Sequence, residues 1–217
     1  WLLKGSVLAE LGRFEDSLEA FDRAIALDAG LVTAWYRKGR SYRDLARYDD
    51  AIAAFDHVLS SDDTCAGAWL NRGSALLSLG RFEPALDSLT RALDLKPQNA
   101  NGWYDRAIAL VELGRDEEAV ASFDRAIAIN RKFTNAWFDK GLALVRLARY
   151  EDAIKAFDYI LEYVPEHAGT HYHKGISLQA LGKYDKAIQS FNHALGDDQT
   201  LSDAKFRTGT CYANLGK

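Results

Sequence analysis

The sequence predicts an all-α protein built from stacked pairs of antiparallel helices. Two observations predict this fold. Tryptophans recur at one fixed interval, and the positions between them carry matching small, aliphatic and aromatic residues. The three prolines, Pro84, Pro97 and Pro165, fall where helices are expected to begin or end. Because one short helix pair cannot bury its apolar face alone, neighbouring pairs must stack into a linear array.

The repeat is 34 residues long. Tryptophan holds the first five places of a series that we call the Trp position, and histidine and lysine continue it. The series reads Trp1, Trp35, Trp69, Trp103, Trp137, His171 and Lys205. A small residue follows each place by four positions, and a leucine follows each by ten. Chance does not produce so many equal intervals with matching residue types, so we predict a repeat architecture.

Each repeat is predicted to hold two helices. In the second repeat the first helix is expected from about Thr33 to Leu45, and Gly39 lets a neighbouring helix approach closely. A glycine that can adopt the left-handed conformation closes the first helix of most repeats. Ala46 and Ala148 replace it in two repeats, where we expect tight or strained turns. The second helix opens with acidic residues, which suit the positive end of the helix dipole.

Two segments carry a known pattern most fully: AWYRKGRSYRDLARYDDAIAAFD and AWFDKGLALVRLARYEDAIKAFD. They resemble tetratricopeptide repeats (TPR), in which W-x2-L-G-x2-Y is followed by A-x3-F and then by Pro. The resemblance covers nearly the whole chain. It implies a right-handed superhelical solenoid of antiparallel helix pairs, in which the first helix of each repeat, helix A, lines a concave surface. The second, helix B, forms the outer wall.

The resemblance divides the chain into a single array. Its repeats span residues 1–31, 32–65, 66–99, 100–133, 134–167 and 168–201, and residues 202–217 form the first helix of a seventh repeat. The first repeat lacks its opening residues, and the chain contains no Met. We therefore expect Trp1 not to be the natural start. We expect the chain to be a segment of a longer array, or its ends to pair with other copies.

One departure from the family pattern is regular. Where the family usually has leucine just before the small residue, this chain has a cation in six repeats: Lys4, Lys38, Arg72, Arg106, Lys140 and Lys174. An aspartate recurs in the second helix of four repeats: Asp22, Asp56, Asp124 and Asp158. We hypothesise that the two series pair across helices, with each surface pair contributing about 0–1 kcal/mol.

Ligands of this family usually lie along the concave surface, and the resemblance assigns that role to fixed positions of helix A and their polar neighbours. On this chain the candidate groove residues are Tyr36, Arg37, Arg40, Arg43, Asn71, Leu77, Asn101, Tyr104, Asp105, Ile108, Val111, Asn135, Phe138, Asp139, Leu142, Val145, Tyr172, Ile176 and Phe206. The set is polar and basic in the second repeat and largely apolar in the fourth to sixth.

This division predicts the chemistry of the partner. An apolar set of this extent is typical of a binding surface, so we expect the C-terminal half to bind an apolar peptide or an amphipathic helix. Short polar side chains such as Asn71 and Asp105 are expected to hydrogen-bond an extended peptide backbone. The aromatic residues one place after the Trp position also have a structural interpretation, because the family usually packs an aromatic there.

A subset of the family binds the C-terminal carboxylate of chaperones with lysine, asparagine and arginine at these positions. With Asn71 as the central asparagine, Tyr36 and Arg40 stand where lysine and asparagine are needed. Asn101 and Asp105 stand where lysine and arginine are needed. The sequence therefore predicts no carboxylate clamp of this kind.

Other classes of function find little support in the composition. The formal charge of −4 disfavours nucleic-acid binding, and no apolar run approaches the roughly 20 residues of a membrane span. Cys65 and Cys211 are interpreted as small apolar residues. His167, His171 and His173 have a spacing that metal sites use, but His171 holds the Trp position, so packing is favoured. We predict no cofactor, metal or catalytic residue and expect a cytoplasmic protein.

Three functions remain open from the sequence. The first is a protein–protein interaction module that holds a peptide or helix of a partner in its groove. The second is a scaffold that self-associates end to end. The third is the non-catalytic arm of a larger enzyme.

Overall fold

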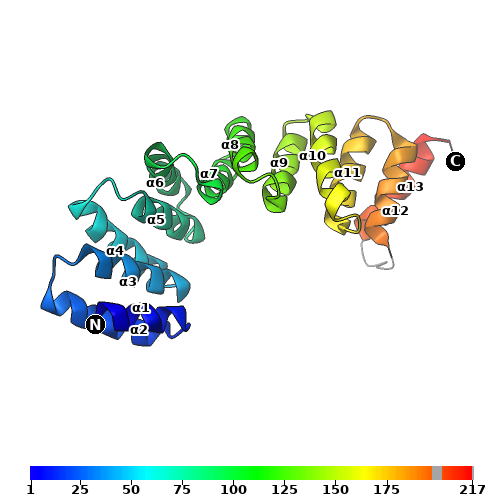
Figure 1. The fold of residues 1–217 in the computed structure, drawn as a ribbon. Helices are drawn as coiled ribbons and strands as arrows, with labels where there is room; N and C mark the ends of the chain where they lie inside the picture. Colours follow the sequence, from blue (N-terminus) through cyan, green and yellow to red (C-terminus); the bar gives the residue numbers. More distant parts are fainter. Residues whose placement is uncertain (197–201, 217) are drawn as a thin grey trace. The chain divides into compact units, whose positions relative to one another are not determined.

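The computed structural model describes residues 1–196 and 202–216, and these ranges form thirteen α-helices and no β-strand (Figure 1). The helices are α1 (Leu2–Glu10), α2 (Phe14–Leu27), α3 (Val32–Asp44), α4 (Tyr48–Ser61), α5 (Ala66–Ser78), α6 (Phe82–Leu95), α7 (Ala100–Glu112), α8 (Asp116–Ile129), α9 (Thr134–Arg146), α10 (Tyr150–Tyr163), α11 (Ala168–Ala180), α12 (Tyr184–Leu195) and α13 (Ser202–Asn214). The end of the predicted sixth repeat, residues 197–201, and the final residue 217 lie outside the described part.

The helices fall into two compact units, Trp1–Gly114 and Arg115–Lys217. In the first unit consecutive helices pack together from α1 with α2 to α6 with α7, and in the second from α8 with α9 to α12 with α13. The A helices also meet their neighbours: α1 contacts α3, α3 contacts α5, α5 contacts α7, and α9 contacts α11. These stacked helix pairs confirm the predicted all-α solenoid fold class.

The helix ends lie where the sequence predicts them. Helix α3 spans Val32–Asp44, which agrees with the expected Thr33–Leu45 within one residue at each end. Pro84 lies in the first turn of α6, where its missing N–H costs no hydrogen bond. Pro97 and Pro165 follow α6 and α10 in the turns between repeats, where they prevent the helices from continuing.

In four of the described helix pairs a phenylalanine ring of helix B lies against a glycine of helix A. In the third repeat Leu89 takes the place of the ring, and in the fourth Ala107 takes the place of the glycine. Phe55 of α4 is fully buried, and a Cβ atom placed on Gly39 of α3 would lie 2.8 Å from its Cε1 atom. In the fifth repeat the corresponding distance from Gly141 to Phe157 is 2.4 Å. Real Cβ atoms do not approach so closely, so the absence of a side chain on helix A allows helix B to pack at this distance.

Four tryptophans hydrogen-bond to the turn that precedes their repeat. The indole N–H of Trp69 donates to the carbonyl oxygen of Asp63 at 2.8 Å. Trp35, Trp103 and Trp137 likewise donate to the carbonyl six residues earlier, at 3.3, 2.8 and 2.9 Å.

His171 makes the same contact at the Trp position of the sixth repeat. Its Nε2 atom lies 2.7 Å from the carbonyl oxygen of Pro165. Because a carbonyl only accepts, Nε2 carries the proton. The ring also stacks on His193, with centroids 4.8 Å apart. The interpretation of His171 as a residue that packs between repeats is therefore confirmed.

The hypothesised pairing of cations with aspartates is confirmed in four repeats. Each pair joins helix A to helix B of the preceding repeat, sixteen residues earlier. The nitrogen–oxygen distances are 2.5 Å for Lys38–Asp22 and 2.6 Å for Arg72–Asp56, Lys140–Asp124 and Lys174–Asp158. Where Thr90 replaces the aspartate, the Nε atom of Arg106 donates to its Oγ1 atom at 3.2 Å, so the contact between the two helices persists as a hydrogen bond.

The same cations lie over the tryptophan rings. The Nζ atom of Lys38 is 5.1 Å from the ring centroid of Trp35, and that of Lys140 is 5.3 Å from Trp137. Burial lowers the pKa of Lys38, but the hydrogen bond to Asp22 and the nearby negative charge outweigh it and raise the pKa above its usual value. The cation that replaces the usual leucine thus keeps its charge while its stem packs on an aromatic face.

Two turns adopt the strained conformation that the sequence predicts. Ala46 and Ala148 have φ angles of 57° and 55°, whereas glycine holds the equivalent place after the other A helices. The N–H of Arg47 donates to the carbonyl of Tyr42 at 2.8 Å and closes α3, so the turn cannot relax without losing the helix end. An alanine in this region costs about 1–2 kcal/mol.

We expect Ala46→Gly and Ala148→Gly each to raise the free energy of unfolding by about 1 kcal/mol, because glycine adopts a positive φ without steric cost. Ala121 is exposed in the middle of α8, so Ala121→Gly serves as a control that should lose about 1 kcal/mol. Urea unfolding followed by circular dichroism measures all three. If the turn variants lose stability as the control does, the two turns are not strained.

Candidate functional site

The predicted groove residues lie on the A helices of both units. In the first unit they come from α3, α5 and α7, and in the second from α9, α11 and α13. Most of them are half-buried; Arg40, Asn101, Asn135 and Phe206 are exposed, and Asn71 is buried. The apolar members are therefore less open to solvent than the sequence suggests. We describe the two units separately.

In the first unit a hydrogen-bonded network joins α3 to α5. The Nη1 atom of Arg43 donates to the Oδ1 atom of Asn71 at 2.5 Å. The Nδ2 atom of Asn71 donates to the hydroxyl of Tyr36 at 3.1 Å and to the carbonyl of Gly67 at 2.7 Å. Asn71 is only 8% exposed. Its amide therefore holds Arg43 and Tyr36 in place and does not stand free at the surface.

A second polar contact joins α5 to α7. The Oγ atom of Ser74 donates to the Oδ2 atom of Asp105 at 2.5 Å. Burial raises the pKa of the Asp105 carboxyl above its usual value, although the Ser74 hydrogen bond and the charge of Arg43 oppose this effect. The polar face of the first unit is thus a linked set of groups whose positions are fixed by one another.

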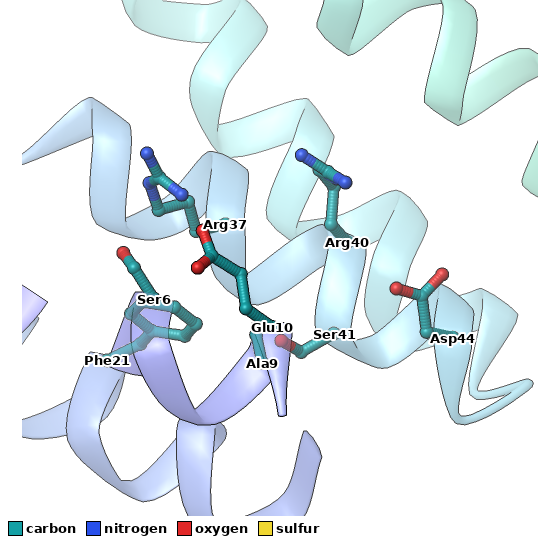
Figure 2. Close-up of a pocket in the computed structure, with 8 residues that line it drawn as sticks. All are labelled: Ser6, Ala9, Glu10, Phe21, Arg37, Arg40, Ser41 and Asp44. Atoms are coloured by element: carbon teal, nitrogen blue, oxygen red, sulfur yellow. The ribbon is translucent and has the colours of Figure 1, made fainter. Parts of the chain in front are cut away.

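A cavity of about 140 Å³ lies between α1 and α3, and two arginines line it (Figure 2). Arg37 and Arg40 project from α3 in the same general direction, and Glu10 of α1 and Asp44 of α3 lie on the same cavity. Asp44 forms an ion pair with Arg43 at 2.7 Å. Neither Arg37 nor Arg40 forms an ion pair within the described ranges 1–196 and 202–216, so both guanidinium groups are available to a carboxylate.

Sequence reasoning missed the acidic side of this cavity. Glu10 and Asp44 were not among the predicted groove residues, although both lie on A helices. Asp44 is nine residues after the Trp position, one place beyond the positions that the family resemblance assigns to the groove. Asp44 directly follows Arg43 in the sequence, and this adjacency to a predicted groove residue is the signal that could have indicated it.

The second unit presents an apolar face built by α9 and α11. Phe138, Leu142 and Val145 lie on α9 at intervals of four and three residues, so they share one helix face. Tyr172 and Ile176 hold the same positions on α11, which packs against α9. All five side chains are half-buried.

Histidine side chains border this apolar face. The ring of Phe138 lies 5.6 Å from that of His167 and 5.7 Å from that of His173. His173 also stacks against the buried Phe157 at 6.3 Å. Burial lowers the pKa of His173, and the positive charge of Arg207 lowers it further. At neutral pH the His173 imidazole is therefore uncharged, and it extends the apolar face beside Phe138.

The three clustered histidines have separate partners. The Nδ1 atom of His167 accepts from the backbone N–H of Thr170 at 3.1 Å and caps α11. His171 binds a backbone carbonyl, and His173 packs between aromatic rings. Among the residues that the structure describes, no group of three metal-ligating side chains is gathered.

Cys211 is fully buried in α13, and burial raises the pKa of its thiol, so it behaves as a small apolar residue. Cys65 is half-buried at the start of α5. Within the described part of the chain, no helix is both long and apolar enough to cross a membrane.

Several solved structures share this fold. YrrB, described as a TPR protein with an unusual peptide-binding site, is 23% identical and matches 89% of this chain and 99% of its own, with a TM-score of 0.81. MamA is 23% identical over 79% of this chain and 94% of its own, with a TM-score of 0.74. A repeat protein from Parabacteroides merdae is 16% identical over 99% and 85%, with a TM-score of 0.73. No curated protein sequence matches the chain.

A family model described as a tetratricopeptide repeat matches residues 1–32, 36–100, 70–132 and 138–202. Proteins with this repeat generally mediate protein–protein interactions, and the fold is typically a non-catalytic module. The match covers nearly all of the sequence and agrees with the 34-residue period and the helix pairs. The chain therefore belongs to the tetratricopeptide repeat family.

Proposed function

We propose that the chain is a protein-interaction module in which the A helices hold a peptide or helix of a partner. One observation carries the proposal: apolar side chains occupy the same two positions on the neighbouring helices α9 and α11, Phe138 and Leu142 on α9 and Tyr172 and Ile176 on α11, and remain half-buried. By contrast, apolar side chains of the core, such as Phe157 and Phe191, are fully buried. Half-burial leaves apolar area that a partner can remove from water.

The two units favour different ligand chemistry. In the second unit the face of Phe138, Leu142 and Ile176 suits the apolar side of an amphipathic helix or an apolar peptide. In the first unit Arg37 and Arg40 lie without an ion pair in the described residues, which favours a ligand segment that carries carboxylates. Ile108 and Val111 lie on α7 and belong to the first unit, so we propose them as contacts of that unit.

Asn71 is proposed as a supporting residue. Its amide oxygen and nitrogen already bind Arg43, Tyr36 and Gly67, so it orients two groove side chains and has little capacity left for a ligand. Asn101 and Asn135 are exposed on α7 and α9 and remain free to hydrogen-bond a peptide backbone.

Replacing Phe138 and Leu142 together with Asp is expected to abolish binding of an apolar partner through the second unit. Each buried side chain of this size contributes about 1.5–3 kcal/mol, so the pair accounts for at least about a hundredfold in affinity. A fluorescein-labelled amphipathic helix with leucine on one face serves as the probe in fluorescence polarisation.

Two variants control this experiment. Leu27 is 78% exposed at the end of α2 and lies outside the groove, so Leu27→Asp should leave the affinity unchanged. Phe138→Ala is milder than the double variant and keeps circular dichroism comparable with the wild type. Unchanged affinity in a folded double variant would rule out the apolar face as the binding surface.

His173 is expected to make stability depend on pH. Its pKa lies below the usual 6.5 in the folded chain, because burial and Arg207 disfavour the imidazolium. The unfolded state binds the proton more readily, so stability is complete above about pH 6.5 and falls as the pH drops toward the lower folded pKa. Thermal unfolding between about pH 7.5 and pH 5 should therefore show a smaller loss for His173→Asn than for the wild type. Equal losses would mean that His173 titrates normally.

A second candidate function is end-to-end self-association, which exposed apolar side chains favour. Leu3 of α1 is 77% exposed, Leu11 directly after α1 is 68% exposed, and Phe206 of α13 is 75% exposed. We expect light scattering to report a mass that rises with concentration, and Leu3→Glu with Phe206→Glu to suppress the rise. A constant monomer mass over the range of about 1 μM to 1 mM would exclude this function.

A further inference from the structure

One place on the second unit, where the fourth repeat ends and the fifth begins, departs from the equivalent places in the other repeats, and the departures gather around a single cavity. The cavity measures about 280 Å³ and is lined by Lys132, Thr134, Tyr159, Ile160 and Tyr163. These residues come from the turn before α9, the first turn of α9 and the last turns of α10 (Figure 1). None of them belongs to the predicted groove.

The repeat architecture does not require these residues. The places equivalent to Tyr159 hold cations or imidazoles in the other repeats: Arg23, His57, Arg91, Arg125 and His193. The places equivalent to Tyr163 in the four preceding repeats hold Leu27, Ser61, Leu95 and Ile129. The turn pair Arg131–Lys132 stands where the other turns have Ala29–Gly30, Asp63–Thr64, Pro97–Gln98 and Pro165–Glu166. Two tyrosines of the fifth repeat and two adjacent cations at the end of the fourth thus have no counterpart at these equivalent places.

The aromatic side of the cavity is held rigidly. Tyr159 stacks on Trp137 with centroids 4.3 Å apart, and Tyr163 lies 5.2 Å from Tyr159 at a tilt of 54°. The hydroxyl of Tyr159 donates to the carbonyl of Arg131 at 3.0 Å, and that oxygen also accepts from the indole of Trp137. Tyr163 is nevertheless 62% exposed. A large aromatic surface is therefore fixed in place and open to solvent.

Two cations, Arg131 and Lys132, lie at the cavity. The guanidinium of Arg131 lies 5.7 Å from the ring centroid of Tyr159, and Lys132 lines the cavity itself. Neither cation forms an ion pair within the described residues 1–196 and 202–216. Glu162 is the carboxylate whose charge acts on Tyr163, and it is exposed on α10. The site therefore combines an apolar aromatic wall with two cations that are open to an anion.

We propose that this cavity is a second interaction site, separate from the groove, that binds a short acidic peptide segment through an aromatic side chain. The aromatic ring of the ligand lies against Tyr159 and Tyr163, where tilted ring packing is favourable. Carboxylates on either side of it meet Lys132 and Arg131. The charge of the rim selects an acidic segment over a basic one.

The test uses three fluorescein-labelled pentapeptides in fluorescence polarisation: Asp-Glu-Phe-Glu-Asp, Asp-Glu-Ala-Glu-Asp and Lys-Arg-Phe-Arg-Lys. The wild-type chain should bind the first at least about tenfold more tightly than the other two. Tyr163→Ala and Lys132→Glu should each weaken that binding by about tenfold or more. Leu27→Ala changes the equivalent exposed residue of the first repeat and is the matched control, which should bind as the wild type does.

Four results would overturn the proposal. The first is no binding of the acidic aromatic peptide up to about 1 mM. The second is equal binding of the basic peptide, and the third is binding that Tyr163→Ala leaves unchanged in a chain with wild-type circular dichroism. The fourth is self-association that Tyr163→Ala abolishes, because the occupant is then a second copy of the chain. Binding that survives the Phe138 and Leu142 double change to Asp supports a site apart from the groove.

Discussion

The close contact between a large apolar side chain on helix B and a small residue on helix A is the constraint on which the rest of each repeat depends. At Gly39 and Gly141 there is no room for a Cβ atom beside the rings of Phe55 and Phe157. Because the rings are fully buried, they fix how closely the two helices approach. That approach fixes which side of helix A remains outside the pair. The candidate groove residues lie on these A helices, so the close approach of helix B affects how much of each of them remains exposed.

Contacts between repeats add register to this packing. The cation that stands in for the family leucine reaches an aspartate on the preceding helix B and lies over the tryptophan of its own repeat, as for Lys38 with Asp22 and Trp35. The pairs are partly exposed, so each contributes only about 0–1 kcal/mol. Their main effect is on the alignment of neighbouring repeats. Both the ion pair of Lys38 and the hydrogen bond from Trp35 to a turn carbonyl form only when the two repeats are in one register. A leucine packs without such direction.

The period predicted the helix pairs, the strained turns at Ala46 and Ala148, and the cation–aspartate pairs, because each of these follows from sequence spacing alone. The environment of the groove residues could not be predicted in the same way. Asn71 stands at a position typical of ligand contact, yet its amide is saturated by Arg43, Tyr36 and a backbone carbonyl. Which polar neighbour a side chain selects depends on distances across helices, and a spacing pattern holds no information about them.

Departures from the period are therefore more informative about binding than the period itself. A residue type that recurs through the array, such as the large buried apolar side chain of helix B, is explained by packing that the repeats share. Tyr159 and Tyr163 occur at places where other repeats have Arg, His, Leu, Ile or Ser, so the fold does not require a tyrosine at either place. An exposed aromatic ring gives up favourable burial in the isolated chain, and Tyr163 does so at 62% exposure. A ligand that covers the Tyr163 ring removes its apolar surface from water, and this burial contributes free energy to binding.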